Sequence, residues 1–343
     1  MSLAVAATVV LSAGGGQAQA RRTWTPKLVV QFGSFSHHSQ FGAVVVEHGQ
    51  AWFFGGSNVA GSGTPKIAYR KNGHWQQPPP ALPSGLHSWI VAASATSPRD
   101  IWAVTFLGGS VIRWNGTAWQ QATRGRWLSG TQFTGILALS AANVWLFGAA
   151  GPHHAGAGTW HWSGSAWSRV RGAAAGLAQA SAASPADLWA VGSRLLAHFN
   201  GTGWHLARPA ALAGFRYRHV LALSPRDVWV AGSRSGAPAL GHFDGRRWTA
   251  VPVPGPAAAT AMCRDGTGGL WVIANSGKVP TGVLHRSAAG RWTFARVGSS
   301  AKDEVLACAW VAGTTAAWGA GRAAPPPGGT GTAAAVYGTG PVP

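Results

Sequence analysis

The chain has 343 residues; 46% are hydrophobic, only 10% are charged, and the formal net charge is +19. Glycine (49) and proline (21) are frequent, a mixture that suits many short strands joined by turns and excludes a protein built of long helices. The length suffices for two ordinary domains or for one repeated architecture that uses all of it.

Residues 1–20 have the pattern of a secretory signal peptide, although their first positions carry no charge. An apolar run from Leu3 to Leu11 leads through glycines to Ala18-Gln19-Ala20, a small-residue cleavage pattern. The run is too short to span a membrane, and no later stretch is long and apolar enough to do so. We therefore expect an exported, extracellular protein without a transmembrane segment, with residues 21–343 forming its mature domain.

Two series of tryptophans recur along the mature chain. One tryptophan of each repeat lies in a strand of small apolar residues, and a second follows it. The first series is Trp52, Trp102, Trp145, Trp189, Trp229, Trp271 and Trp318, and the second is Trp75, Trp119, Trp167, Trp204, Trp248 and Trp292. Repeats of about 40–50 residues made of short strands are typical of propeller blades.

The clearest repeat runs from Val220 to Val251 and divides into four short strands, predicted at 220–223, 228–232, 239–243 and 247–251. Ser224-Pro225-Arg226-Asp227 predicts a turn, because proline sets φ at the second position and serine and aspartate bond back to the backbone. Asp244-Gly245 predicts a tight hairpin. Turn chemistry, strand pattern and period agree, and together they predict an all-β, seven-bladed β-propeller of four-stranded blades.

The last repeat has a second strand around Trp318 and a third-strand candidate at 333–337, but no fourth strand follows. A match lies at the other end of the chain, where Arg22-Thr23-Trp24 and the residues after it resemble Arg247-Trp248-Thr249. We therefore predict that residues 22–30 complete the last blade and close the ring.

The repeat resembles that of secreted bacterial seven-bladed β-propellers, a superfamily with kelch-like, sialidase-like and WD40-like rings, and the resemblance covers residues 22–340. It implies an architecture and no particular activity. The sialidase Asp-box, Ser-x-Asp-x-Gly-x-x-Trp, is absent, and the WD40 Gly-His and Trp-Asp dipeptides do not recur at fixed places. Sialidase chemistry and WD40 scaffolding are therefore not implied.

An up-and-down blade divides its connections between two faces of the disc. The first–second and third–fourth turns of every blade share one face, called the turn face below, and are short and stereotyped. The second–third loops and the inter-blade loops share the other, the loop face, and vary in length. Binding residues usually lie on variable loops held by a rigid frame, so we expect the site on the loop face.

Titratable residues give no catalytic or metal-binding set. Of eight acidic residues, six fall in the repeated turns, and only Asp303 and Glu304 lie in an inter-blade loop, which is a poor source of the separated carboxylates of glycoside hydrolysis. His161, His198, His242 and His285 share one third-strand position, which indicates structural imidazoles packed on the aromatic layer or bonded to backbone. We predict no catalytic residues of these types, no metal and no cofactor.

Cys263 and Cys308 occupy equivalent positions, interpreted as the beginnings of inner strands in neighbouring repeats. They are either two small buried apolar residues or one disulfide between adjacent blades, which export would permit. The first alternative is favoured, because we expect adjacent inner strands to lie beyond the roughly 7 Å Cα limit for a disulfide.

Basic and aromatic residues that do not follow the repeat gather in the predicted inter-blade loops, where Arg208 and Phe215 also lie. The candidate ligand-binding residues are His37, His38, His87, Trp89, Arg124, Arg126, Trp127, Arg216, Tyr217, Arg218 and His219. Aromatic rings beside guanidinium groups suit sugars, acidic polysaccharides or phosphorylated ligands. The alternative is that Trp89 and Phe215 fill gaps between blades while the arginines are only solvated.

The positive charge maps to both faces and forms no single stripe, which argues against specific nucleic-acid binding and favours attraction to anionic polymers outside the cell. We expect a monomeric, non-catalytic propeller whose partner is a glycan, an anionic cell-surface polymer or a protein. Two alternatives remain open. One is a polysaccharide lyase or hydrolase that uses Tyr217 with His219, or His87, as acid and base. The other is a purely structural scaffold.

Overall fold

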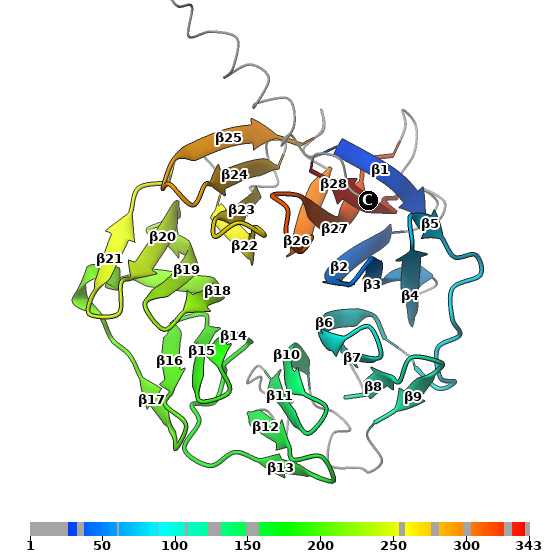
Figure 1. Cartoon of the computed structure of the whole chain (residues 1–343), viewed down its shortest axis with the longest axis horizontal. Coiled ribbons are helices and arrows are strands. Elements are labelled where there is room, and N and C mark those ends of the chain that lie inside the picture. The colour runs from blue at the N-terminus through cyan, green and yellow to red at the C-terminus, as the bar shows by residue number, and fades with distance from the viewer. Residues whose placement is uncertain are drawn as a thin grey trace, which may run out of the picture.

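Seven four-stranded antiparallel sheets surround one axis in the computed structural model of the chain (Figure 1). The structure describes residues 27–32, 38–59, 62–86, 88–106, 109–122, 132–148, 158–253, 258–275, 281–297, 303–325 and 331–339. Each sheet is one blade, and its strands follow one another from the axis outward. The prediction of an all-β, seven-bladed propeller is confirmed.

The blades are numbered here in chain order. The first is β2 (His38–Glu47), β3 (Gln50–Val59), β4 (Ser62–Lys71) and β5 (His74–Trp75), and the second is β6 (Ile90–Ser97), β7 (Asp100–Thr105), β8 (Val111–Trp114) and β9 (Trp119–Gln121). The third is β10 (Phe133–Ser140), β11 (Asn143–Gly148), β12 (Thr159–Trp162) and β13 (Trp167–Arg169), and the fourth is β14 (Gln179–Ser184), β15 (Asp187–Gly192), β16 (Leu195–Phe199) and β17 (Trp204–Leu206).

The fifth blade is β18 (Phe215–Ser224), β19 (Asp227–Arg234), β20 (Ala237–Phe243) and β21 (Trp248–Val251), preceded by the 3-10 turn η2 (Ala210–Leu212). The sixth is β22 (Ala258–Arg264), β23 (Leu270–Asn275), β24 (Gly282–Arg286) and β25 (Trp292–Arg296). The seventh is β26 (Glu304–Trp310), β27 (Ala317–Ala323), β28 (Ala333–Gly338) and β1 (Lys27–Phe32). The first tryptophan series lies on the second strands and the second series on the fourth strands.

The ring is closed by the N-terminal strand, as predicted. β1 is the outer strand of the seventh blade and pairs antiparallel with β28, with Lys27 opposite Gly338 and Phe32 opposite Ala334. The strand occupies 27–32 where the sequence predicted 22–30, and Trp24 lies outside the described residues. A second contact joins the seventh and first blades, because the Ser39 amide donates to the Thr332 carbonyl at 2.8 Å.

A polar unit built around the second-strand tryptophan repeats in the blades. In the fifth blade the Trp229 indole N–H donates to the Asp227 carboxylate at 2.6 Å, and His242 Nε2 bonds the same oxygen at 2.9 Å. The His242 ring stacks on Trp229 with centroids 4.3 Å apart. The residue opposite the tryptophan in the sheet register therefore lies beside it and shares its acceptor.

Other blades vary the members of this unit. The third-strand partner and its acceptor are Arg113 with Asp100, His161 with Asn143, His198 with Asp187, and His285 with Asp265, at 2.7, 3.0, 2.8 and 2.7 Å. The predicted repeated position of the four histidines and their packing on the aromatic layer are confirmed. Their partner is an aspartate or asparagine side chain and not the backbone, because the turn places that residue at the beginning of, or shortly before, the second strand.

Asp265 is the most deeply buried acceptor of this series. Burial alone would raise the pKa of its carboxyl, but hydrogen bonds from His285, from the Thr267 backbone and hydroxyl and from the Gly269 backbone outweigh it and hold the pKa below the ordinary value of 3.8. Asp265 is therefore ionised in the folded protein at neutral pH.

The substitution Asp265→Ala should lower the free energy of unfolding by about 3 kcal/mol, since it leaves several buried donors without an acceptor. The stabilisation by the ionised carboxylate is fully present above about pH 4 and is lost as the pH falls through the lowered folded pKa. Urea denaturation at pH 7 and pH 3 measures both effects. Asp244→Ala, in an exposed hairpin turn, is the control, and an equal loss there would contradict this role for Asp265.

The inner strands approach the second strands closely near the loop face. A Cβ atom added at Gly232 would lie 2.0 Å from the Arg216 carbonyl oxygen, and one at Gly55 or Gly321 would meet the Gln40 or Glu304 carbonyl oxygen at 1.9 or 1.8 Å. Glycine is required where the bulged inner strand crosses this point, as between Tyr217 and His219.

Of the two alternatives for the cysteines, the structure has the disulfide. Cys263 of β22 and Cys308 of β26 are bonded, with their Cα atoms 5.7 Å apart. Both cysteines lie toward the ends of their inner strands and not at the beginnings, because those strands start earlier than predicted. Adjacent inner strands converge on the axis, which brings their Cα atoms within the bonding range. The bond joins the sixth blade to the seventh.

The double substitution Cys263→Ser and Cys308→Ser should destabilise the protein by as much as about 4 kcal/mol, the loop-closure value for a bond that joins residues 45 positions apart. The measurement is thermal or denaturant unfolding with and without a reducing agent. The reductant should lower the stability of the wild type and leave the double variant unchanged; a wild type that is indifferent to reduction would contradict the prediction.

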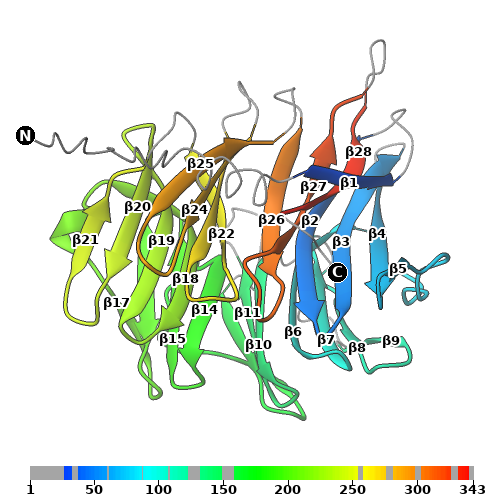
Figure 2. The same cartoon turned by 45° about the horizontal axis from the view of Figure 1, so that its top comes forward.

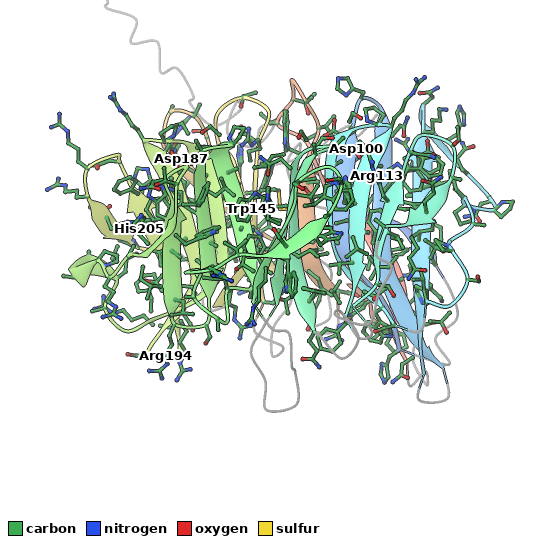
Figure 3. All side chains as sticks on the ribbon, turned by 90° about the horizontal axis from the view of Figure 1, so that it is seen from below. Asp100, Arg113, Trp145, Asp187, Arg194 and His205 are labelled. Atoms are coloured by element: carbon green, nitrogen blue, oxygen red, sulfur yellow. A yellow bond between two sulfur atoms is a disulfide. The ribbon has the colours of Figure 1, made fainter. Side chains whose placement is uncertain are left out.

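The connections gather at the two ends of the strands, as predicted (Figure 2). Asp100 and Asp187, which follow first–second turns, lie at one end of the disc, and Arg194, in a second–third turn, lies at the opposite end (Figure 3). The turn face and the loop face are therefore distinct surfaces.

Candidate functional site

A pocket of about 550 Å³ opens on the loop face where the fourth and fifth blades meet. Three arginines, Arg194, Arg208 and Arg216, contribute to its lining together with Phe215 and Tyr217. The pocket thus combines guanidinium groups with aromatic side chains, the residue types that the sequence singled out.

Three different elements of the fourth and fifth blades position the three arginines. Arg194 lies in the turn between β15 and β16, Arg208 follows β17, and Arg216 is the second residue of β18. The inter-blade segment 207–214 forms one wall of the pocket and is fixed by Leu212, which is buried in the apolar cluster between the fourth and fifth blades. The rim of the pocket is therefore held by a rigid core.

Residues 215–219 lie in a strand and not in a loop, which corrects the sequence prediction. β18 begins at Phe215, five residues earlier than expected. Its first residues alternate between buried and exposed, with Phe215 and Tyr217 buried and Arg216 and Arg218 exposed. The strand is extended because β19 also continues, to Arg234, and pairs with it. Phe215 fills the gap between blades, as one alternative held, while Arg216 stays in solvent.

The arginines at this face have no protein counter-ion. Arg194, Arg208, Arg216, Arg218 and Arg234 are all exposed, and no carboxylate lies within 4.0 Å of their nitrogens in the described part of the chain. All eight acidic residues of the chain are described. Seven of them form ion pairs with histidine or arginine, and the eighth, Asp303, accepts a backbone amide.

The ion pairs are Glu47 with His48, Asp100 with Arg113, Asp187 with His198, Asp227 with His242, Asp244 with Arg247, Asp265 with His285 and Glu304 with Arg322. Asp303, which precedes β26, accepts the Ala324 amide at 2.8 Å. The positive charge around the pocket is therefore uncompensated within the chain.

Tyr217 and His219 do not form an acid/base pair. Tyr217 packs in the apolar cluster between the fourth and fifth blades. His219 lies beyond the β-bulge and pairs with Ala231, a member of the cluster between the fifth and sixth blades. The bulge thus directs the two side chains to opposite faces of the sheet. Burial raises the pKa of the Tyr217 hydroxyl, so the phenol is neutral at ordinary pH.

His219 carries a buried Nδ1 atom without a hydrogen-bond partner among the described residues. Burial lowers the pKa of its imidazole to about 4. The ring is therefore neutral at physiological pH and contributes no positive charge to the loop face.

Trp89 and His38 lie away from the pocket, at the first and second blades. Trp89 precedes β6 and is half-buried, and its indole lies so close to Gly56 and Gly63 that a Cβ atom at either would be 2.6 Å from it. Trp89 thus fills the gap between blades. His38 is exposed and begins β2, so it belongs to a strand where a loop was predicted.

Five of the candidate residues, His37, His87, Arg124, Arg126 and Trp127, lie outside the described residues. Within the described ranges, no group of three or more histidine, cysteine, aspartate or glutamate side chains could hold a metal ion. No helix in the described part of the chain is long and apolar enough to cross a membrane. Arg194, which follows β15, and Arg234, which ends β19, were not singled out from the sequence, because both lie at second–third connections and the candidates were selected from the inter-blade loops.

Comparison with known proteins identifies the fold alone. No family model matches the chain, and no curated protein matches it. YCF48 bound to D1 peptide is similar over 94% of this chain and 97% of its own, with 11% identity and a TM-score of 0.63. An inactive virginiamycin B lyase from Staphylococcus aureus with quinupristin is similar over 91% and 99%, with 11% identity and a TM-score of 0.64.

A third similar structure is the extracellular domain of the putative hybrid two component system BT3049 from B. thetaiotaomicron, with 11% identity and a TM-score of 0.60. It matches 91% of this chain and 42% of its own. These structures share the propeller with this protein, and their identities are too low to transfer an activity.

Replacing His219 by leucine should flatten the pH dependence of stability between about pH 6.5 and pH 4. The folded imidazole has its pKa lowered to about 4, so the unfolded chain binds more protons in this window and the wild type loses stability as the pH falls. The loss reaches at most about 3 kcal/mol. Urea denaturation from pH 7 to pH 4 measures it. The exposed His205 supplies the control, and a His219→Leu variant that keeps the wild-type slope would contradict the assignment.

Proposed function

We propose that this protein is an exported, non-catalytic binding propeller that holds negatively charged groups of a partner in the loop-face pocket between the fourth and fifth blades. The observation that carries the proposal is the set of three exposed arginines around this pocket, Arg194, Arg208 and Arg216, with no carboxylate beside them. The partner is an anionic glycan or cell-surface polymer, or an acidic segment of a protein.

Guanidinium groups suit this role for a physical reason. Arginine stays charged at every physiological pH, is weakly hydrated, and presents its donors as a planar fork that matches carboxylate, sulfate and phosphate oxygens. The neighbouring Phe215 and Tyr217 are buried in the core and hold the strand that carries Arg216 in place. A rigid frame around several charged donors lowers the entropy cost of binding an extended anion.

Propellers of the same fold were solved with bound molecules, YCF48 with D1 peptide and an inactive virginiamycin B lyase with quinupristin. The complex of YCF48 with a peptide supports a peptide or protein partner, while the charge of the pocket supports any polyanion. The disulfide between Cys263 and Cys308 supports export, since such bonds persist in oxidising compartments. A monomer is expected, because β1 completes the seventh blade from within the chain.

The enzyme alternative requires an acid and a base that converge on one bond. Tyr217 and His219, the pair that the sequence offered, lie on opposite faces of β18, and the half-buried His219 has its Nδ1 atom enclosed by the protein. No observation on the described residues favours that alternative over binding.

The double substitution Arg208→Ala and Arg216→Ala should weaken binding to dextran sulfate or poly-L-glutamate by roughly tenfold, the sum of two solvent-exposed charge contacts. Biolayer interferometry at increasing salt measures the affinity, and the wild-type affinity should fall steeply with ionic strength. Uncharged dextran gives the baseline. Preference for dextran sulfate indicates a glycan or polymer partner, and preference for poly-L-glutamate indicates a protein.

The matched control is Arg246→Ala with Arg291→Ala, which removes the same charge from exposed third–fourth turns of the turn face. The control should bind nearly as well as the wild type. Equal weakening by both double variants would mean that the overall positive charge, and not the pocket, attracts the polymer, and would overturn the proposal.

A further inference from the structure

The first blade departs from the polar unit that its neighbours share. Its second-strand tryptophan, Trp52, donates to the Gln50 side-chain oxygen at 3.4 Å, where the next four blades have an aspartate or asparagine at the position of Gln50. The third-strand residue opposite Trp52 is Tyr69, where those blades have histidine or arginine. Tyr69 stacks on Trp52 with ring centroids 3.7 Å apart.

Because the first blade has a tyrosine where the next blades have histidine or arginine, the Tyr69 hydroxyl is left without a hydrogen-bond partner among the described residues. In the fifth blade, for example, His242 bonds Asp227, so that both members are satisfied. The Tyr69 hydroxyl forms no hydrogen bond with any described residue, and Gln50 has no partner for its amide N–H groups in the same part of the chain. Burial raises the pKa of Tyr69, so its hydroxyl remains a donor at neutral pH.

A hollow of about 360 Å³ lies in front of these two residues, on the turn face between the first and second blades. Gln50, Tyr69, Lys71 and Gln76 line it from the first blade, and Arg99 and Trp114 line it from the second. Its volume is in the range of sites for small molecules. It lies at the opposite face from the arginine pocket, and the sequence analysis did not predict a site there.

The charge of the hollow is positive. Lys71 and Arg99 are exposed, and neither has a carboxylate within 4.0 Å among the described residues. No acidic side chain lines the hollow. The aliphatic part of the Arg99 side chain packs against Gly116. Its Cγ atom lies only 2.8 Å from the position that a Cβ atom at Gly116 would take. Gly116 has a φ of +98°, which the hairpin turn requires, so this approach is built into the second blade.

We propose that this hollow binds one acidic sugar, a uronic-acid unit. The carboxylate is held by Lys71 and Arg99, and the sugar hydroxyls are bonded by the Tyr69 hydroxyl and by the side-chain amides of Gln50 and Gln76. Trp114 is buried and borders the hollow with only a small part of its ring, so it forms the floor on which the apolar face of the sugar rests. A fixed tyrosine hydroxyl, two amides and two cations around one aromatic wall match a ligand that has both a charge and several hydroxyls.

Titration of the full-length protein with sodium glucuronate, followed by saturation-transfer difference NMR, tests the assignment. Glucose is the neutral sugar and acetate the carboxylate without a ring. Glucuronate should bind more tightly than either. Lys71→Gln should weaken glucuronate binding by roughly tenfold, the effect of one charge-assisted hydrogen bond. Tyr69→Phe keeps the ring on Trp52, so that the fold is retained, and should weaken binding less.

Lys66→Gln is the matched control, because Lys66 lies on the same strand, β4, and changes the charge equally. Its ammonium contacts the Ser39 hydroxyl at 3.3 Å, outside the hollow. The assignment is overturned if glucuronate binds no better than acetate, or if Lys66→Gln and Lys71→Gln weaken binding alike. The Arg208→Ala and Arg216→Ala variant should bind glucuronate as the wild type does, so failure of this inference leaves the proposed function untouched.

Discussion

In six of the seven blades the second-strand tryptophan packs against the side chain opposite it on the third strand, and much of the ring depends on this contact. Each tryptophan buries a large apolar surface between blades, but its indole N–H needs an acceptor there. In several blades the turn before the second strand supplies that acceptor, and histidine or arginine then bonds the same acceptor while covering the ring, as Asp227, Trp229 and His242 do. The repeat is thus defined by a hydrogen-bonded group of side chains as much as by its apolar pattern.

This arrangement has a consequence for the surface. The chain has only eight acidic residues, and four of them, Asp100, Asp187, Asp227 and Asp265, are engaged in these units near the turn face. Few carboxylates remain to neutralise the exposed arginines and lysines. The net charge of +19 is therefore concentrated on groups free to meet an external anion, and the scaffold itself makes both faces attractive to one.

The sequence was sufficient to predict the architecture, since most repeats share their turn residues and two series of tryptophans recur along the chain, and the resemblance of the N-terminal residues to a fourth strand located the closing strand within a few residues. It was insufficient for the site. The start of β18 at Phe215 depends on pairing with the extended end of β19, and the bulge after Tyr217 reverses which face His219 occupies. Such features arise between strands and have no local signature. The cysteine bond likewise depends on how closely two inner strands converge at the axis.

The departures of single residues from the repeat are more informative about binding than the repeat itself. Blades two to five pair the acceptor before the second strand with a histidine or arginine. Tyr69 with Gln50 breaks that pairing, and a hollow with two uncompensated cations lies in front of them. In the fifth blade, the early start of β18 places Arg216 on the rim of the arginine pocket. A ring of repeated blades tolerates such exceptions because each blade packs mainly on its two neighbours, so a change at one blade acts on the contacts at its own two borders.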